Sequence, residues 1–257
     1  MSIPSIVLLT DFGQKDGFIG TMKGVIQGIC PGAHVIDLTH DLPPQSISAA
    51  QFVLWNSYKF FPKDTIFCCV VDPGVGGDRP ILAVQTEKYV FIAPDNGLLD
   101  FVLSEERPRF ILRVENPKVM LSGISQTFHG RDIFAPTAAH LAAGFLYTQL
   151  GPVHSWSAPT SPFLVPTAPG VFDLNVLHID HFGNLITNLK LPLDASLELE
   201  SVTWKGNSLN RLVKSYNEVA KGELLAIHGS HGLLEIACNQ GRAVDLVEAA
   251  GMKVNIQ

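Results

Sequence analysis

Short apolar runs alternate with helix-like segments through the first part of the chain. Runs rich in β-branched and aromatic residues at 6–10, 34–38, 65–71 and 110–114 predict strands, and 81–86 with 89–93 predict a hairpin around Glu87 and Lys88. Helical spacing of apolar residues predicts helices over 18–29, 46–58 and 133–143, and a short helix within 97–103. Strands that alternate with helices indicate βαβ units and a mostly parallel sheet flanked by helices.

Local signals set some of the boundaries. Cys30, Pro31 and Gly32 should end the first helix, and Ser46 is a plausible N-cap for the second. The run 65–71 is almost entirely apolar, which is typical of a strand buried on both faces. Adjacent Cys68 and Cys69 should therefore point to opposite faces of the sheet.

The pattern changes after about residue 151. Residues 152–170 hold five prolines among Ser, Thr and Ala, a composition typical of a stiff linker. Short strands are then predicted at 171–179, 185–189, 201–204, 223–228, 233–237 and 253–256, which favours a small, mostly β barrel or sandwich. We therefore predict an α/β protein with an N-terminal domain (1–151) around a mostly parallel sheet, a linker (152–170), and a smaller, mostly β, barrel-like C-terminal domain (171–257).

Composition narrows the class of protein. With 46% hydrophobic and 16% charged residues, the chain as a whole is not intrinsically disordered. A net charge of −6 gives no basic surface for nucleic acid. No apolar run reaches the ~20 residues of a membrane span, and the first residues do not resemble a signal peptide. The four cysteines lack CxxC spacing, so we expect reduced core cysteines in a cytoplasmic protein without structural zinc.

Two predicted strands each end on a carboxylate. Asp11 follows residues 6–10, and Asp72 follows 65–71 and precedes a Pro-Gly turn. In an open α/β sheet, ligands bind at the carboxyl ends of the strands. Arg79 lies seven residues beyond Asp72, and His129 precedes the predicted helix at 133–143. A carboxylate beside a guanidinium stays ionised, and a neutral histidine can exchange a proton near pH 7, so the three could hold and polarise one water molecule. Turn formation and helix capping remain alternatives.

Two other groups of residues suit a nucleoside. Asp11, with Asp16 close by, could accept hydrogen bonds from a ribose diol, and no glycine-rich phosphate motif accompanies it. In the turn 180–184, Asn184 could read an adenine edge, Phe182 could stack on a base, and Asp180 could pair with an ammonium group. Simple turns are the alternative at both places. His178 and His181 lack the spacing of a metal site, so we expect no metal.

Five segments, in this order, resemble the S-adenosyl-L-methionine (SAM) hydroxide adenosyltransferases, which are water-using relatives of the bacterial fluorinase and chlorinase: 9–13, 71–76, 93–99, 127–132 and 179–184. The resemblance extends from about residue 6 to 239. Each segment alone is a weak signal, and their common order makes the resemblance specific. It implies a catalytic group of Asp72, Arg79 and His129. The substrate contacts that it implies are Asp11 for the ribose diol, Asp16 and Asp180 near the methionine ammonium, Phe128 near ribose C5′, Phe182 and Asn184 for adenine, and Ser230 at the amino-acid end.

The resemblance also implies a reaction. Water or hydroxide would attack C5′ of SAM and release adenosine and L-methionine, without a metal or cofactor, in a homotrimer with its sites at subunit interfaces. A halogenase is the first alternative, and the carboxylate of Asp72 argues against it because it would repel a halide. A non-catalytic module that binds SAM or adenosine is the second. His231 follows Ser230 where some relatives have Arg, which leaves the contact to the methionine carboxylate open.

Overall fold

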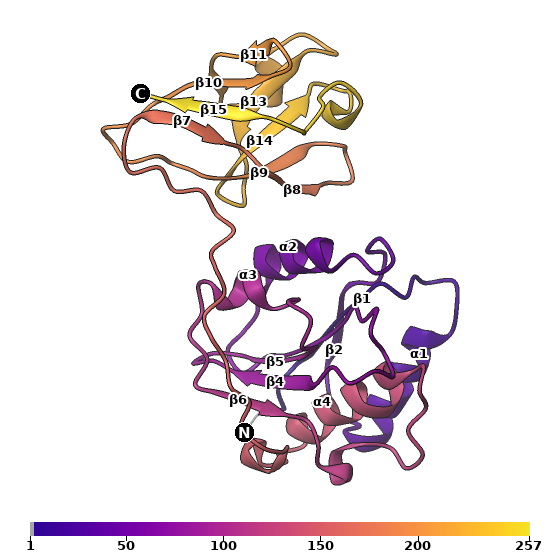
Figure 1. Ribbon diagram of the computed structural model, residues 1–257. Helices are drawn as coiled ribbons and strands as arrows, with labels where there is room; N and C mark the ends of the chain where they lie inside the picture. The colour runs from indigo at the N-terminus through magenta and orange to yellow at the C-terminus, as the bar shows by residue number, and fades with distance from the viewer. Residues whose placement is uncertain (1–2) are drawn as a thin grey trace. The chain divides into compact units, whose positions relative to one another are not determined.

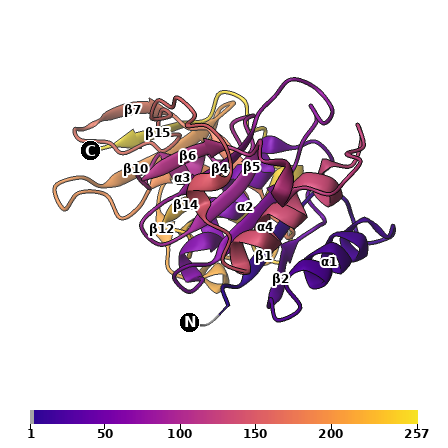
Figure 2. The same ribbon diagram turned by 90° about the horizontal axis from the view of Figure 1, so that it is seen from below.

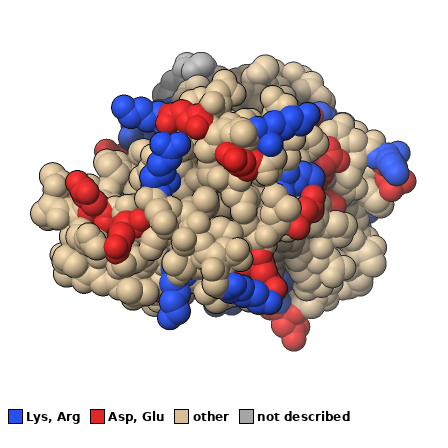
Figure 3. Space-filling view, turned by 90° about the horizontal axis from the view of Figure 1, so that it is seen from above, with Lys and Arg blue, Asp and Glu red and all other residues tan. Residues whose placement is uncertain are grey.

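The computed structural model describes residues 3–257 and divides into two compact units between Ser161 and Pro162 (Figure 1). Each unit has its own cluster of buried apolar side chains. Within the part of the chain that is described, no helix is long and apolar enough to cross a membrane. On the face drawn in Figure 3, acidic and basic side chains are interspersed rather than gathered by sign.

The first unit contains a six-stranded sheet in the order β2-β1-β3-β5-β4-β6. Its strands are β1 (Ile6–Thr10), β2 (Val35–Thr39), β3 (Ile66–Val70), β4 (Ile81–Gln85), β5 (Val90–Pro94) and β6 (Phe110–Arg113). The pairs of β1 with β2, β1 with β3, and β3 with β5 are parallel, whereas β4 runs antiparallel to both β5 and β6. The sheet is thus mixed, because the predicted two-residue hairpin loop at Glu87 and Lys88 forces β4 and β5 to be antiparallel.

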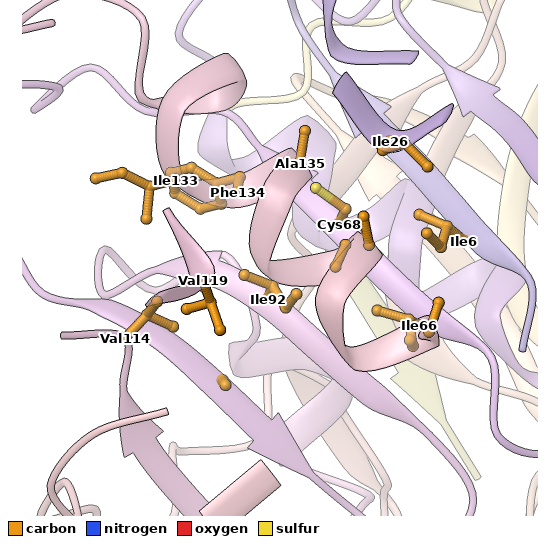
Figure 4. Packing of buried hydrophobic residues seen from close by; sticks show 14 of the residues in the cluster. Ile6, Ile26, Ile66, Cys68, Ile92, Val114, Val119, Ile133, Phe134 and Ala135 are labelled. Carbon is orange, nitrogen blue, oxygen red and sulfur yellow. The ribbon is translucent and has the colours of Figure 1, made fainter. Parts of the chain in front are cut away.

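Helices cover both faces of this sheet (Figures 1 and 2). On one face, α1 (Phe18–Ile29) and α4 (Ala135–Ala142) pack on a set of side chains that includes Ile6, Cys68 and Ile92 (Figure 4). The other face carries α2 (Ile47–Ser57) and the short α3 (Asp100–Leu103). The predicted N-cap is confirmed, since Ser46 Oγ accepts the amide N–H of Ala49 at 3.3 Å.

The alternation of side chains along β3 separates the two cysteines as predicted. Cys68 belongs to the cluster under α1 and α4, and Cys69 is fully buried outside that cluster. Burial raises the pKa of the Cys68 thiol to about 12. All four cysteines are free and buried, which agrees with the reading of reduced core residues.

The helix predicted at 133–143 begins differently. A wide π-type turn spans Gly130–Phe134, and α4 follows it. Pro136 has no N–H to donate to the carbonyl of Asp132, and that carbonyl instead accepts the amide of Leu121 at 2.9 Å. The amide of Ala135 reaches back five residues to the carbonyl of Gly130. The turn carries the chain from His129 into the core.

The second unit contains two sheets, in the orders β11-β10-β15-β7 and β12-β13-β14-β9-β8. The strands of the first are β7 (Gly170–Asp173), β10 (Leu199–Trp204), β11 (Asn207–Leu209) and β15 (Lys253–Ile256). Those of the second are β8 (Val176–Ile179), β9 (Leu185–Lys190), β12 (Leu212–Val213), β13 (Leu224–His228) and β14 (Leu233–Cys238). Apolar side chains of both sheets share one core, so the unit is a sandwich of separate sheets rather than one closed barrel.

The prediction of a single strand at 171–179 is wrong. The chain leaves one sheet after Asp173 and enters the other at Val176. Between them, Leu174 is buried and donates its amide to the carbonyl of Met252, while the amide of Asn175 donates to the side chain of Asn188. These hydrogen bonds to distant residues divide the continuous apolar run between two sheets. The short strands β11 and β12 were not predicted.

Candidate active site

The parallel pairing of β1 with β3 brings the two strand-end carboxylates to one edge of the sheet. Leu9 is opposite Cys69 and Thr10 is opposite Val70, so Asp11 and Asp72 leave their strands side by side. Both line a pocket of about 240 Å³ in the first unit, together with Phe128 and His129. The structure therefore joins three of the predicted segments at the carboxyl ends of the strands, where α/β proteins bind ligands.

Asp72, Arg79 and His129 form a continuous hydrogen-bonded chain. The guanidinium Nε of Arg79 lies 2.9 Å from both carboxylate oxygens of Asp72, and its terminal nitrogen makes a further short contact with one of them. The same terminal nitrogen lies 2.9 Å from Nδ1 of His129. The side chains of Asp72 and Arg79 are only 4% and 13% exposed, so this ion pair is shielded from solvent.

The contact with Arg79 fixes the proton on His129. A guanidinium can only donate hydrogen bonds, so Nδ1 of His129 must be the acceptor and the neutral ring carries its proton on Nε2. Burial lowers the pKa of His129 below its ordinary value of 6.5, and the positive charge of Arg79 lowers it further. A hydrogen bond with the backbone of Ser125 acts in the opposite direction but does not outweigh these effects, so at neutral pH the ring is uncharged.

Close packing holds the loop of Asp72 and the loop of His129 together. Gly76 has φ +79, and a Cβ there would lie 2.3 Å from the carbonyl oxygen of Gln126, so only glycine allows the loop of Asp72 to approach the loop of His129. The side-chain amide of Asn96 donates to the carbonyl of Val71 at 2.9 Å. The segment 93–99 thus supports the end of β3 rather than lining the pocket.

Asp132 is a buried residue that sequence reasoning missed. Its carboxylate accepts the amide of Ser125 at 2.8 Å and the guanidinium Nε of Arg131 at 2.6 Å. Burial acts to raise the pKa of Asp132, but the hydrogen bonds from Arg131 and Ser125 outweigh it, and the pKa is lowered. The charged carboxylate pins the loop that presents Phe128 and His129. Its place in the segment 127–132 was the available signal.

Asp11 is held by a residue that the sequence did not single out. The backbone amide of Gln45 donates to its carboxylate at 2.6 Å, and Gln45 itself has φ 65, an uncommon value for a residue with a side chain. Gln45 also lines the pocket. Backbone strain of this kind clusters at functional sites. The preceding pair of prolines was the only sequence signal.

The predicted contact Asp16 is exposed and does not line this pocket. It lies in the loop between Asp11 and Phe18, and this loop is anchored by three aromatic rings. The centroids of Phe12, Phe18 and Phe128 are 5.2–6.0 Å apart in edge-to-face pairs. These rings connect the start of α1 to the wall of the pocket.

The remaining predicted contacts lie in the second unit. The carboxylate of Asp180 accepts both the backbone amide and the side-chain amide of Asn184, each at 2.9 Å, so the turn 180–184 closes on itself. One side-chain donor of Asn184 is therefore already used. Phe182 is 71% exposed, and it lines a separate pocket of about 490 Å³ with Asn184 and Tyr216. Ser230 is exposed in the turn between β13 and β14. No group of three metal-binding side chains occurs within residues 3–257.

Family models match nearly the whole chain. The N-terminal domain of the SAM hydroxide adenosyltransferases matches residues 6–151, and the C-terminal domain of the same family matches residues 174–254. The chain belongs to the SAM hydroxide adenosyltransferase family. A family member from Thermus thermophilus, named (R)-S-adenosyl-L-methionine hydrolase, is 37% identical, with 96% of each chain covered.

More distant relatives include halogenases. A fluorinase from an Actinoplanes species is 29% identical over 72% of each chain. Among solved structures, an uncharacterized conserved protein from Thermotoga maritima matches with a TM-score of 0.84 and 35% identity, covering 98% of this chain and all of the other. The similarity to the adenosyltransferase branch is thus both higher and more extensive than the similarity to this halogenase.

The buried, cation-facing position of His129 predicts its titration in this adenosyltransferase. We expect the imidazole to titrate below 6.5, and Arg79→Met to raise its pKa, because burial and Arg79 both disfavour the imidazolium. Because the imidazole has the higher pKa in the unfolded chain, the unfolded state binds a proton at this site at a higher pH than the folded state does. His129 should therefore lower the free energy of unfolding as the pH falls below 6.5. The measurement is an NMR titration of the ring. Arg109→Met, at an exposed site, is the control and should leave the titration unchanged. A His129 pKa at its ordinary value in both the wild-type protein and the Arg79→Met variant would contradict the assignment.

Proposed function

We propose that this protein hydrolyses SAM at ribose C5′ and releases adenosine and L-methionine. The observation that carries the proposal is the buried chain of Asp72, Arg79 and His129 on the wall of a pocket that also contains Asp11. Membership of the SAM hydroxide adenosyltransferase family and the hydrolase names of the relatives support it. We further propose that the enzyme acts in the cytoplasm without a metal or cofactor.

The substrate's own chemistry makes this arrangement sufficient. Attack of a water oxygen on C5′ breaks the C5′–S bond, and the electron pair stays on sulfur, so methionine leaves as a neutral thioether and needs no general acid. The protein must hold and aim the nucleophile, and good alignment is worth up to about 7–11 kcal/mol. Asp72 accepts a hydrogen bond from the water and takes its proton as the new bond forms, the charge of Arg79 favours hydroxide character, and His129 holds the guanidinium of Arg79 through Nδ1.

The proposed substrate contacts follow the family pattern. Asp11 holds the ribose diol and Phe128 forms the wall near C5′. On the second unit, the proposed contacts are Phe182 and Asn184 for adenine, Ser230 at the amino-acid end and Asp180 for the ammonium. Asp16 of the first unit is proposed as a further contact to the ammonium. The domains proposed are 1–151 and 171–257, joined by the linker 152–170. A homotrimer is part of the proposal, and light scattering should give three times the mass of one chain.

The name of the Thermus relative specifies the (R) configuration at sulfur. We therefore propose that the (R) sulfonium epimer is a substrate. Incubation with each epimer separately will test this, and adenosine released only from the (S) epimer would contradict it.

The decisive experiment is turnover in ¹⁸O-labelled water with enzyme far below substrate. We expect one ¹⁸O at the 5′ oxygen of adenosine and an equal amount of unlabelled methionine. The same incubation with added chloride or fluoride tests for a halogenase, which would release 5′-halogenated nucleoside instead. If the protein retained the ligand without turnover, it would be a binding module rather than a hydrolase.

A further inference from the structure

His40 is a buried histidine that the site described above does not use. It follows β2 directly, and almost none of its surface is exposed. Its Nδ1 lies 2.9 Å from the hydroxyl oxygen of Thr10, the last residue of β1, which is itself completely buried. Its Nε2 lies 3.1 Å from a carboxylate oxygen of the exposed Asp37. The imidazole therefore links the surface of β2 to the strand end that delivers Asp11.

An irregularity in the sheet brings His40 to this place. The parallel pairing of β1 with β2 shifts between Leu8 and Leu9, because β2 has one residue more than β1 at this point. The shift places His40 beside Thr10, whereas Thr39 would lie there in a regular register. A bulge of this kind redirects a side chain and is common next to functional sites.

The hydrogen bonds around His40 run in one direction. A carboxylate only accepts, so Nε2 carries the proton that faces Asp37, and Nδ1 of the neutral ring is an acceptor. The hydroxyl of Thr10 therefore donates to Nδ1, and its oxygen accepts the backbone amide of Phe12 at 3.3 Å. The carbonyl of His40 in turn accepts the amide of Gly13 at 2.8 Å. His40 thus holds the chain both at Thr10 and at Gly13.

The order of carboxylate, imidazole and hydroxyl is also that of a nucleophilic triad. The hydroxyl of Thr10 is completely buried, however, so it cannot reach a substrate. The residues that do reach the pocket are the next two, since Asp11 and Phe12 both line it. A chain that is held on both sides of Asp11 fixes the direction in which its carboxylate leaves β1.

We propose that His40 is a positioning residue for the ribose-diol contact: it holds Thr10 and Gly13 so that the carboxylate of Asp11 meets both hydroxyl groups of the ribose. The inference rests on the proposed function, from which it takes the contact between Asp11 and the diol. A carboxylate accepts two neighbouring hydroxyl groups only in one orientation, so a small rotation of the loop loses part of this contact. The contacts to adenine do not depend on that orientation.

The test compares adenosine with 2′,3′-dideoxyadenosine, which lacks both hydroxyl groups of the diol. The measured quantity is the Kd of each nucleoside, by calorimetry on the full chain. Thr10→Val removes the hydroxyl but keeps the branched side chain. We expect it to weaken adenosine binding by about tenfold and dideoxyadenosine binding by less than about twofold. Thr10→Ser restores the hydroxyl and should keep both Kd values within about twofold of the wild-type values.

Thr137→Val is the matched control. Thr137 is also completely buried in the first unit, and its hydroxyl donates to the carbonyl of Val119 at 3.3 Å. Its substitution removes a buried hydrogen bond of another segment, so the ratio of the two Kd values should stay unchanged. Asp37→Ala removes the acceptor of His40 from the surface and should change the ratio in the same direction as Thr10→Val. It carries the test if the Thr10→Val protein does not fold.

The outcomes separate this inference from the proposed function. An unchanged ratio in Thr10→Val and Asp37→Ala would overturn the role of His40, and so would an equal loss of affinity for both nucleosides, which is the effect of general loosening. Asp11→Ala tests the diol contact itself. If that variant kept the wild-type ratio, the proposed ribose contact would be wrong and the inference with it. If Asp11→Ala lost the preference for adenosine while Thr10→Val and Asp37→Ala kept it, only the inference would be wrong.

Discussion

Asp72→Asn should reduce adenosine release by about 10²–10⁴-fold, the range associated with loss of a positioned acid–base group. The substitution keeps the shape of the side chain but removes the charge that holds Arg79, whose Nε lies 2.9 Å from both carboxylate oxygens. It also removes one of the two carboxylates that line the pocket, the other being that of Asp11. Substrate binding should change little, because the contacts proposed for ribose and adenine involve other residues. Adenosine release by chromatography and binding by calorimetry measure the two effects separately.

The substitution should also affect folding. Breaking a buried ion pair by removing one partner costs about 3–5 kcal/mol, since the remaining charge stays buried. The assays therefore belong at a temperature where circular dichroism shows the variant folded. Asp173→Asn is the control, because its carboxylate is 81% exposed and forms an ion pair with the exposed Lys253. If Asp72→Asn lost binding and turnover to the same degree, the catalytic role of Asp72 would be wrong.

Phe134→Ala should lower the free energy of unfolding by about 3–5 kcal/mol. Phe134 is fully buried at the end of the π-type turn and packs in the cluster that also contains Ile133 and Ala135 (Figure 4). Truncation removes its apolar contacts and leaves a cavity between the sheet and α4. Because the amides of Arg131 and Asp132 in the same turn donate to the carbonyl of Phe128, the proposed wall near ribose C5′, the remaining folded protein should also bind adenosine more weakly, as calorimetry will measure. Urea unfolding measures the stability change.

Phe60→Ala provides the matched comparison for that variant. Phe60 is 85% exposed, so the same chemical change should alter the free energy of unfolding by no more than about 0.5 kcal/mol. Equal losses in the two variants would show that burial in the core does not set the cost.

The sequence predicted most elements of the first unit because its signals are local. Helix α1 has the predicted bounds, and β1 ends where the apolar run meets Asp11. The N-cap at Ser46 depends only on residues within one helical turn. Each bound of β2, β3 and β6 lies within one residue of its prediction, which is the usual fraying of element ends. The family resemblance then selected the pocket residues Asp11, Asp72, Phe128 and His129.

The residues that complete the pocket gave weaker signals. Gln45 acts through its backbone amide and a positive φ, and no side-chain type reports either feature. Asp132 lies just before the predicted helix, and its carboxylate anchors the backbone amide of Ser125 across the loop. Sequence patterns report the type of each side chain. The roles of Gln45 and Asp132 depend instead on which backbone amides lie within hydrogen-bond distance of a carboxylate.

The sequence by itself determined that two strands deliver Asp11 and Asp72, since hydrophobic runs and turn residues act over a few positions. Only the tertiary structure decided that Arg79 meets His129 across 50 residues, that the chain changes sheets after Asp173, and that a second pocket is lined by Arg79 and His129. The physical reason is that periodicity reports which face of an element is apolar. Contacts between residues far apart in the sequence depend on how all of these apolar faces pack together. They also depend on which distant groups come within hydrogen-bond distance of backbone groups that lack a partner in their own helix or strand.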